Sequence, residues 1–129
     1  MSNPILRLGA VYFGLNAALM WALPQLWYQL TPGVAAMGPF NLHFIRDIAL
    51  AMAVSGAAFW AAAVQGNRSL ALFACGWPLL HALFHIWIWA MHRGAALDLI
   101  AGVNLLGIQA PAWATFWAAM RLHKQEVLA

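Results

Sequence analysis

Residues 40–64 read FNLHFIRDIALAMAVSGAAFWAAAV, an apolar run with three polar side chains near its start. A helix needs about 20 mostly apolar residues to cross the hydrocarbon core of a bilayer, and this run is long enough. Its second half is dense in alanine, glycine and serine, which let helix backbones approach closely in lipid. The segment therefore predicts a transmembrane helix that packs tightly against a neighbour.

Composition extends this interpretation to the whole chain. Of its 129 residues, 65% are hydrophobic and only 7% are charged. A soluble domain carries about 25% charged residues, because it must cover its surface with them. We therefore predict an integral membrane protein whose main partner is the lipid bilayer. The formal net charge of +3 fits membrane topology and anionic lipid, so no nucleic-acid partner is expected.

Four apolar segments of similar length divide the chain, and we expect one transmembrane domain over residues 1–129. The segments cover about 8–30, 40–64, 69–91 and 98–120. The links between them are short, which favours antiparallel neighbours. None of the segments alternates apolar and polar residues as a barrel strand does. The predicted fold is all-α: an integral membrane up-down four-helix bundle.

Prolines interrupt three of the four predicted helices: Pro24, Pro78 and Pro111. Proline has no backbone N–H, so the carbonyl four residues earlier loses its helical partner. The carbonyls freed in this way belong to Met20, Ala74 and Gly107. Membrane helices tolerate such breaks where a neighbouring helix or water satisfies the freed group.

Basic residues predict the orientation of the bundle. One end carries four of them: Arg7, Arg68, Arg121 and Lys124. The loops at the other end carry only Arg93. Because positive residues mark the cytoplasmic side, we expect both termini to be cytoplasmic. The chain is then a multi-pass protein of a bacterial inner membrane, with loops 31–39 and 92–97 outside.

Polar side chains form two pairs within the second and third segments. His43 and Asp47 are four residues apart, and so are His81 and His85, so each pair shares one helix face. In antiparallel helices both pairs fall in the outer half of the bundle. A charge near the bilayer centre costs about 2.5–3.5 kcal/mol on insertion scales. Several polar groups at one level therefore indicate that they compensate one another.

Three interpretations of this cluster stay open. It is a hydrogen-bonded core that fixes helix packing, in a homo-oligomer or as a structural or accessory subunit of a larger membrane complex. Alternatively, His43, Asp47, His81 and His85 bind a transition metal in a redox or metal-handling role. Such ligands suit zinc, copper or iron, although the absence of thiolate argues against copper(I) storage. Haem, quinone or proton-coupled chemistry ranks third.

Three further residues are expected to surround these side chains: Arg46, Asp98 and Asn41. Arg46 projects about 100° from Asp47 on its helix, so the two need not pair. It could reach Asp98 or extend outward to the interface. Asp98 opens the fourth segment, where a carboxylate suits the positive end of a helix.

The remaining residues identify no catalytic mechanism, so whether the protein is an enzyme stays open. Cys75 is the only cysteine, which excludes an internal disulfide and a Cys-x-x-Cys-His haem attachment. No nucleophile–base pair or phosphate-binding loop is present. We expect Asn16, Asn104 and Gln109 to form hydrogen bonds between helices.

The segments GPFNLHFIRDIAL (38–50) and HALFH (81–85) resemble a pattern in small four-helix bacterial membrane proteins. In that pattern an Asn-x-His-Phe-x-Arg-Asp segment opens the second helix and a His-Ala-x-x-His segment lies on the third. Those proteins are generally uncharacterised. The resemblance therefore implies a shared site around these residues without naming a reaction.

Overall fold

The computed structural model describes residues 3–122, which form a helical bundle with no strand among them. Four helices are long and apolar enough to cross a membrane: Pro4–Ala22, Leu42–Gln65, Arg68–His92 and Leu99–Met120. The predicted all-α membrane fold is confirmed. The helical segments are α1 (Pro4–Ala22), α2 (Pro24–Leu30), η1 (Ala35–Met37), α3 (Leu42–Gln65), α4 (Arg68–Ala74), α5 (Gly76–His92), α6 (Leu99–Asn104), η2 (Leu105–Gln109) and α7 (Ala110–Met120).

Each span begins at a residue whose side chain caps the first turn. These caps are Asn3, Asn41, Asn67 and Asp98. A capping oxygen accepts a hydrogen bond from a backbone N–H that has no partner inside the helix. The first helix therefore begins at Pro4, directly after its cap, rather than at residue 8. Gly66 ends α3 in the left-handed conformation, as glycine does at many helix ends.

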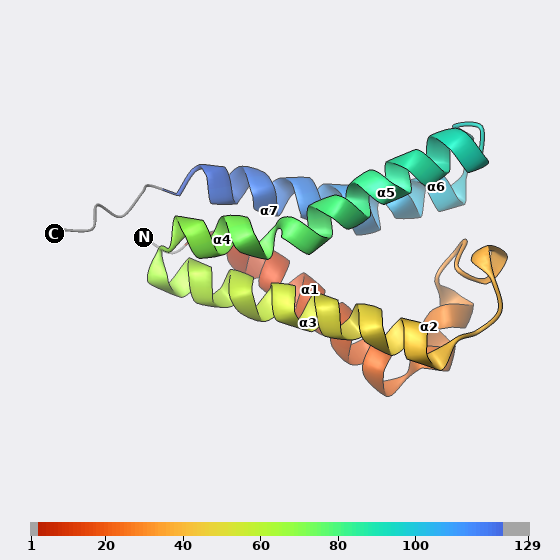
Figure 1. Ribbon diagram of the computed structural model, residues 1–129, viewed down its shortest axis with the longest axis horizontal. Coiled ribbons are helices and arrows are strands. Elements are labelled where there is room, and N and C mark those ends of the chain that lie inside the picture. The colour runs from red at the N-terminus through yellow and green to blue at the C-terminus, as the bar shows by residue number, and fades with distance from the viewer. Residues whose placement is uncertain (1–2, 123–129) are drawn as a thin grey trace, which may run out of the picture.

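The helices pack most closely at the end of the bundle where α1 begins and α7 ends. Figure 1 shows α1 and α3 running together, with α4 and α7 covering them at this end. A buried core fills the space between these four helices: Leu6, Ala10, Phe13, Phe59, Ala62, Ala63, Ala71, Ala74, Cys75, Ala118 and Ala119. Most of its members are alanines, so the helices associate through small side chains.

Glycines allow the closest helix contacts. A Cβ atom added to Gly56 of α3 would lie 3.0 Å from the carbonyl oxygen of Ala10 and 3.2 Å from the backbone nitrogen of Gly14. Both of these atoms belong to the backbone of α1. Gly9 of α1 packs in the same way against the methyl group of Thr115 on α7. The small residues of the second span therefore form the tight contact that the sequence predicts.

The opposite end of the bundle is more open. Figure 1 shows α5 and α6 turning away from α3 towards this end. In keeping with this, α3 packs extensively against α4 and much less against α5. Neither α2 nor α6 contains a buried residue. The two helical hairpins therefore touch at one end and diverge at the other.

Helix irregularities occur near Pro24, Pro78 and Pro111. The chain leaves the helix at Leu23, directly before Pro24. The third span breaks at Cys75, three residues before Pro78. In the fourth span, the residues before Pro111 form the π-helical turn η2.

One of the three freed carbonyls has a partner on another helix. The hydroxyl of Tyr12 on α1 donates a hydrogen bond to the carbonyl of Gly107, at 2.5 Å. Pro111 has no N–H to offer that carbonyl, so a side chain of the neighbouring helix satisfies it.

Candidate functional site

Two histidines lie against each other on α5. The ring centroids of His81 and His85 are 4.6 Å apart, with an interplanar angle of 62°. Trp77 stacks on His81 with a centroid distance of 4.8 Å and an angle of 13°. These three residues are spaced by four, so they follow one face of the helix. All three are partly buried.

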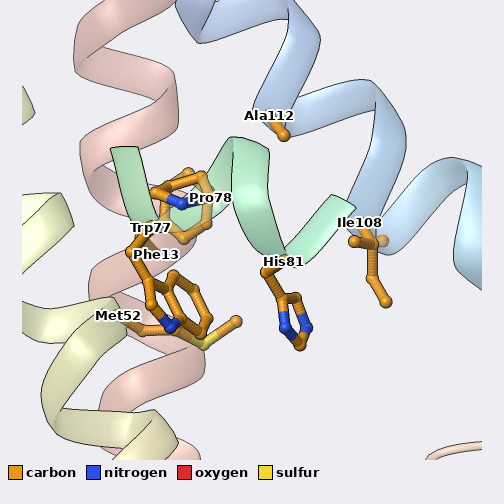
Figure 2. Close-up of a pocket in the computed structure, with 8 residues that line it drawn as sticks. Phe13, Met52, Trp77, Pro78, His81, Ile108 and Ala112 are labelled. Atoms are coloured by element: carbon orange, nitrogen blue, oxygen red, sulfur yellow. The ribbon is translucent and has the colours of Figure 1, made fainter. Parts of the chain in front are cut away.

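The imidazole of His81 projects into a small hollow between the helices (Figure 2). The hollow holds about 220 Å³ of empty space, including its open mouth. Its lining comes from all four spans: Phe13, Met52, Trp77, Pro78, His81, Gly107, Ile108 and Ala112. Its enclosed cavity volume is only about 10 Å³, room for one water-sized group, whereas small-molecule pockets begin at roughly 300 Å³. The hollow therefore suits a single ion. His81 supplies its only ionisable side chain.

A chain of amide hydrogen bonds holds the histidine-bearing turn of α5. Gln109 is buried, and its Nε2 donates to the Ala82 carbonyl at 2.8 Å and to Asn104 Oδ1 at 3.1 Å. Asn104 Nδ2 donates in turn to the His85 carbonyl at 3.5 Å. Trp113 Nε1 donates to Gln109 Oε1 at 3.1 Å. The network therefore fixes the backbone beside both histidines.

This network depends on the π-helical turn η2 (Leu105–Gln109). A π turn places residues five apart above one another, and Asn104 and Gln109 have this spacing. Gly107 and Ile108 of the same turn line the hollow beside His81. Single π turns are rare and occur frequently at functional sites. The sequence predicts interhelical hydrogen bonds for Asn104 and Gln109, but it does not show that they surround a site.

His43 and Asp47 form a separate pair on α3. His43 Nδ1 lies 2.9 Å from Asp47 Oδ2, and the two side chains are 86% and 59% exposed. The structure therefore brings together His43 with Asp47, and His81 with His85, but it does not gather all four. Within residues 3–122, no three histidine, cysteine, aspartate or glutamate side chains lie close enough to hold a metal ion.

The three neighbouring residues have roles of their own in the structure. The guanidinium of Arg46 lies over the Trp21 ring, 5.0 Å from its centroid, and does not reach Asp98. Arg93 takes that carboxylate instead, through Nη1–Oδ1 at 3.3 Å and Nη2–Oδ2 at 2.5 Å. The two bonds make the Arg93–Asp98 pair bidentate, which is the strong geometry for arginine and a carboxylate. Asn41 caps α3 by accepting from the Phe44 N–H.

Asp98 makes one further contact, as the cap of α6. Its Oδ1 accepts a hydrogen bond from the backbone N–H of Ala101 at 3.0 Å. The hydrogen bonds from Arg93, and then the one from Ala101, hold the pKa of Asp98 below its usual range. The carboxylate therefore anchors the loop end of the fourth span rather than the histidine site.

The surface of the bundle agrees with a bilayer environment. Large apolar side chains face outward along every span, among them Leu15, Val54, Leu80 and Leu106. No protein-family model, curated protein or solved structure matches the chain, so its four apolar spans alone identify it as a multi-pass helical membrane protein.

Proposed function

We propose that this membrane protein binds a transition-metal ion through His81 and His85, in a metal-handling or redox role. The pairing of two imidazoles with ring centroids 4.6 Å apart carries this proposal. Histidines spaced by four on one helix face can ligate the same ion, as in helical zinc motifs. Imidazole nitrogen suits zinc, copper and iron.

The surroundings of the pair are suited to holding it in place. Trp77 stacks on one face of the His81 ring and restricts its rotation. The amide network from Gln109 and Asn104 fixes the backbone at Ala82 and His85. Groups that orient ligands in this way typically change metal affinity by about 10–100-fold when they are removed.

Two imidazoles leave coordination positions open. His43 and Asp47 would fill them only if the loop ends of α3 and α5 came together, since in the structure they form their own exposed pair. The open positions otherwise accept another protein side chain, water or a bound substrate. A site with free positions fits transfer or reaction of the metal better than permanent structural binding.

The test is metal binding by the purified protein in detergent. We expect up to one equivalent of a transition metal per chain. His81→Ala and His85→Ala should each weaken binding at least about tenfold, or about 1.4 kcal/mol, because each removes a ligand. His92→Ala is the matched control, since His92 lies exposed at the end of α5. Elemental analysis and metal titration measure the result.

Acidification gives a second readout of the same site. Neutral imidazole is the form that coordinates a metal, so protons compete and occupancy should fall as the pH is lowered. Binding that is independent of pH and of both histidines would contradict the proposal. Haem held by one of these imidazoles would appear instead as a Soret band in the same preparation.

A structural role is the second candidate, and the exposed pair on α3 favours it. Polar side chains that face lipid are costly, so His43 and Asp47 would gain from a partner helix that covers them. The chain would then be a subunit of a homo-oligomer or of a larger membrane complex. Metal-free protein from metal-replete cells, with no Soret band, would leave this candidate in place.

We further infer that both termini are cytoplasmic and that the histidine pairs lie in the outer half of a bacterial inner membrane. Arg68 Nη2 lies 3.9 Å from the sulfur of Met120, so its charge is at the end of the bundle that holds the termini. A reporter that requires the periplasm should be active when fused after Gly94 and silent after Asn67, because basic residues stay inside. The reverse pattern would place the histidines on the cytoplasmic side.

A further inference from the structure

We infer that the histidine site takes copper(I) and that the thioether of Met52 is its third ligand. This inference rests on the proposed function and specifies its ion. Met52 belongs to α3, is partly buried and lines the same hollow as His81. Figure 2 shows its sulfur-bearing end extending from α3 towards the His81 imidazole.

Met52 is the residue that α3 contributes to this site. The side chain packs against the main core and also against the small cluster of Met20, Ile45 and Ala49. It therefore lies where the two helical hairpins begin to diverge. A ligand at this position would join α3 to α5 at a level where the two helices otherwise touch little.

The donor set selects the metal. Thioether sulfur is a soft ligand that favours copper(I), whereas zinc takes thiolate, imidazole and carboxylate. His85 is not among the residues that line the hollow, but its ring lies against that of His81, with centroids 4.6 Å apart, so both imidazoles can share one ion. The missing thiolate argued against copper(I) storage in the sequence, and the Met52 thioether supplies a soft sulfur in its place. Methionine is easily overlooked in a sequence, because it fills apolar space far more often than it binds an ion.

Charge leads to the same ion. None of the eight residues that line the hollow is acidic, so the donors carry no negative charge. A cation in an apolar environment is destabilised unless charge compensates it. This penalty grows steeply with the charge of the ion, so a monovalent ion is better accommodated than a divalent one. Copper(I) is the monovalent ion that these ligands bind.

The experiment compares copper(I) with zinc(II) on the same purified protein. Under reducing conditions, copper(I) is titrated against a chromogenic copper(I) chelator, and zinc(II) is titrated in parallel. Met52→Leu should weaken copper(I) binding at least about tenfold and leave zinc(II) binding unchanged, because leucine keeps the volume and removes the sulfur. Met91→Leu is the matched control, since Met91 is exposed on α5.

Spectroscopy gives a direct readout of the ligand. X-ray absorption at the copper edge should show a sulfur scatterer in the wild type and in Met91→Leu, and none in Met52→Leu. A spectrum without sulfur in the wild type would overturn the inference even if the affinity changes.

The outcomes separate this inference from the proposed function. Wild-type protein that binds zinc(II) but not copper(I) would overturn the inference and leave the two-histidine site standing. The same holds if Met52→Leu changes neither affinity, or lowers both equally together with the melting temperature. Protein that binds none of copper(I), zinc(II) and iron(II) would overturn the proposed function itself. His81→Ala should weaken both ions.

Discussion

Gly56→Leu is expected to cost about 3 kcal/mol or more of stability, the upper end of the usual penalty for overpacking. Even the first carbon of a side chain at this position would lie 3.0 Å from the Ala10 carbonyl oxygen. Both atoms nearest to it are backbone atoms of α1, which cannot rotate away as a side chain can. The two helices would have to separate, and the contact that organises the bundle would be lost.

Thermal or denaturant unfolding in detergent measures this effect. Gly76→Leu is the control, because Gly76 is exposed and no heavy atom lies within 4 Å of its added Cβ. Leucine is also the better helix former, so that variant should be neutral or slightly more stable. Equal melting of the two variants would show that α1 and α3 are not in close contact.

Gln109→Leu is expected to destabilise the protein by about 2 kcal/mol. The Gln109 side chain takes part in three hydrogen bonds, to the Ala82 carbonyl, Asn104 and Trp113. Only the bond to Ala82 joins two spans, and interhelical hydrogen bonds in membranes contribute on average about 0.6 kcal/mol. The two bonds within the fourth span supply the rest, since a typical hydrogen bond contributes roughly 0.5–1.5 kcal/mol net. The loss of stability should be larger where a group that was hydrogen-bonded to Gln109 stays buried and finds no new partner.

The same variant should weaken metal binding by about 10–100-fold, because the turn that carries His81 and His85 loses its anchor. Gln25→Leu is the control, since Gln25 is exposed on α2 and should change neither property. Unfolding in detergent and metal titration give the two measurements. A Gln109 variant that matches the control in both would show that the network is not required.

Much of the fold follows from local sequence. Apolar length gives the four spans, and the carboxylate of Asp98 marks where the fourth begins. Asn41, expected beside the histidine site, caps α3 instead. The run of small residues in the second span predicts its close packing, which Gly56 provides. The spans and the start of the fourth could be predicted because they depend on neighbours in the chain. The run of small residues predicts close packing but not that α1 is the partner.

The site could be predicted only in part, because depth along a helix does not give the direction of a side chain. Asp47 and the α5 histidines occupy the same half of the bundle, as the count of residues indicates. Asp47 is nine residues before Gly56, however, and at about 100° per residue it points to the opposite side of α3. Since Gly56 faces α1, Asp47 faces away from it. Convergence of the four ligands also required α3 and α5 to run together, whereas they diverge.

The residues that complete the site gave weaker signals. Met52 looks like an ordinary apolar residue of a membrane helix, and only its place in the hollow sets it apart. Pro111 predicts an interruption of the fourth span but does not specify a π turn. The turn occurs together with the Gln109 bond to Ala82 and the Tyr12 bond to Gly107, and both are contacts with other spans.

The π turn also affects how related chains would align with this one. Asn104 and Gln109 are five residues apart and hydrogen-bonded, although five residues in a regular α-helix differ in direction by about 140°. The fourth span therefore contains one residue more than an unbroken helix would need for the same contact. In a related chain whose fourth helix is regular, the two amides would stand four residues apart. In an alignment, a gap of one residue between these two positions, before Pro111, would therefore identify a chain that has the same pair of amides but lacks the extra residue of the π turn.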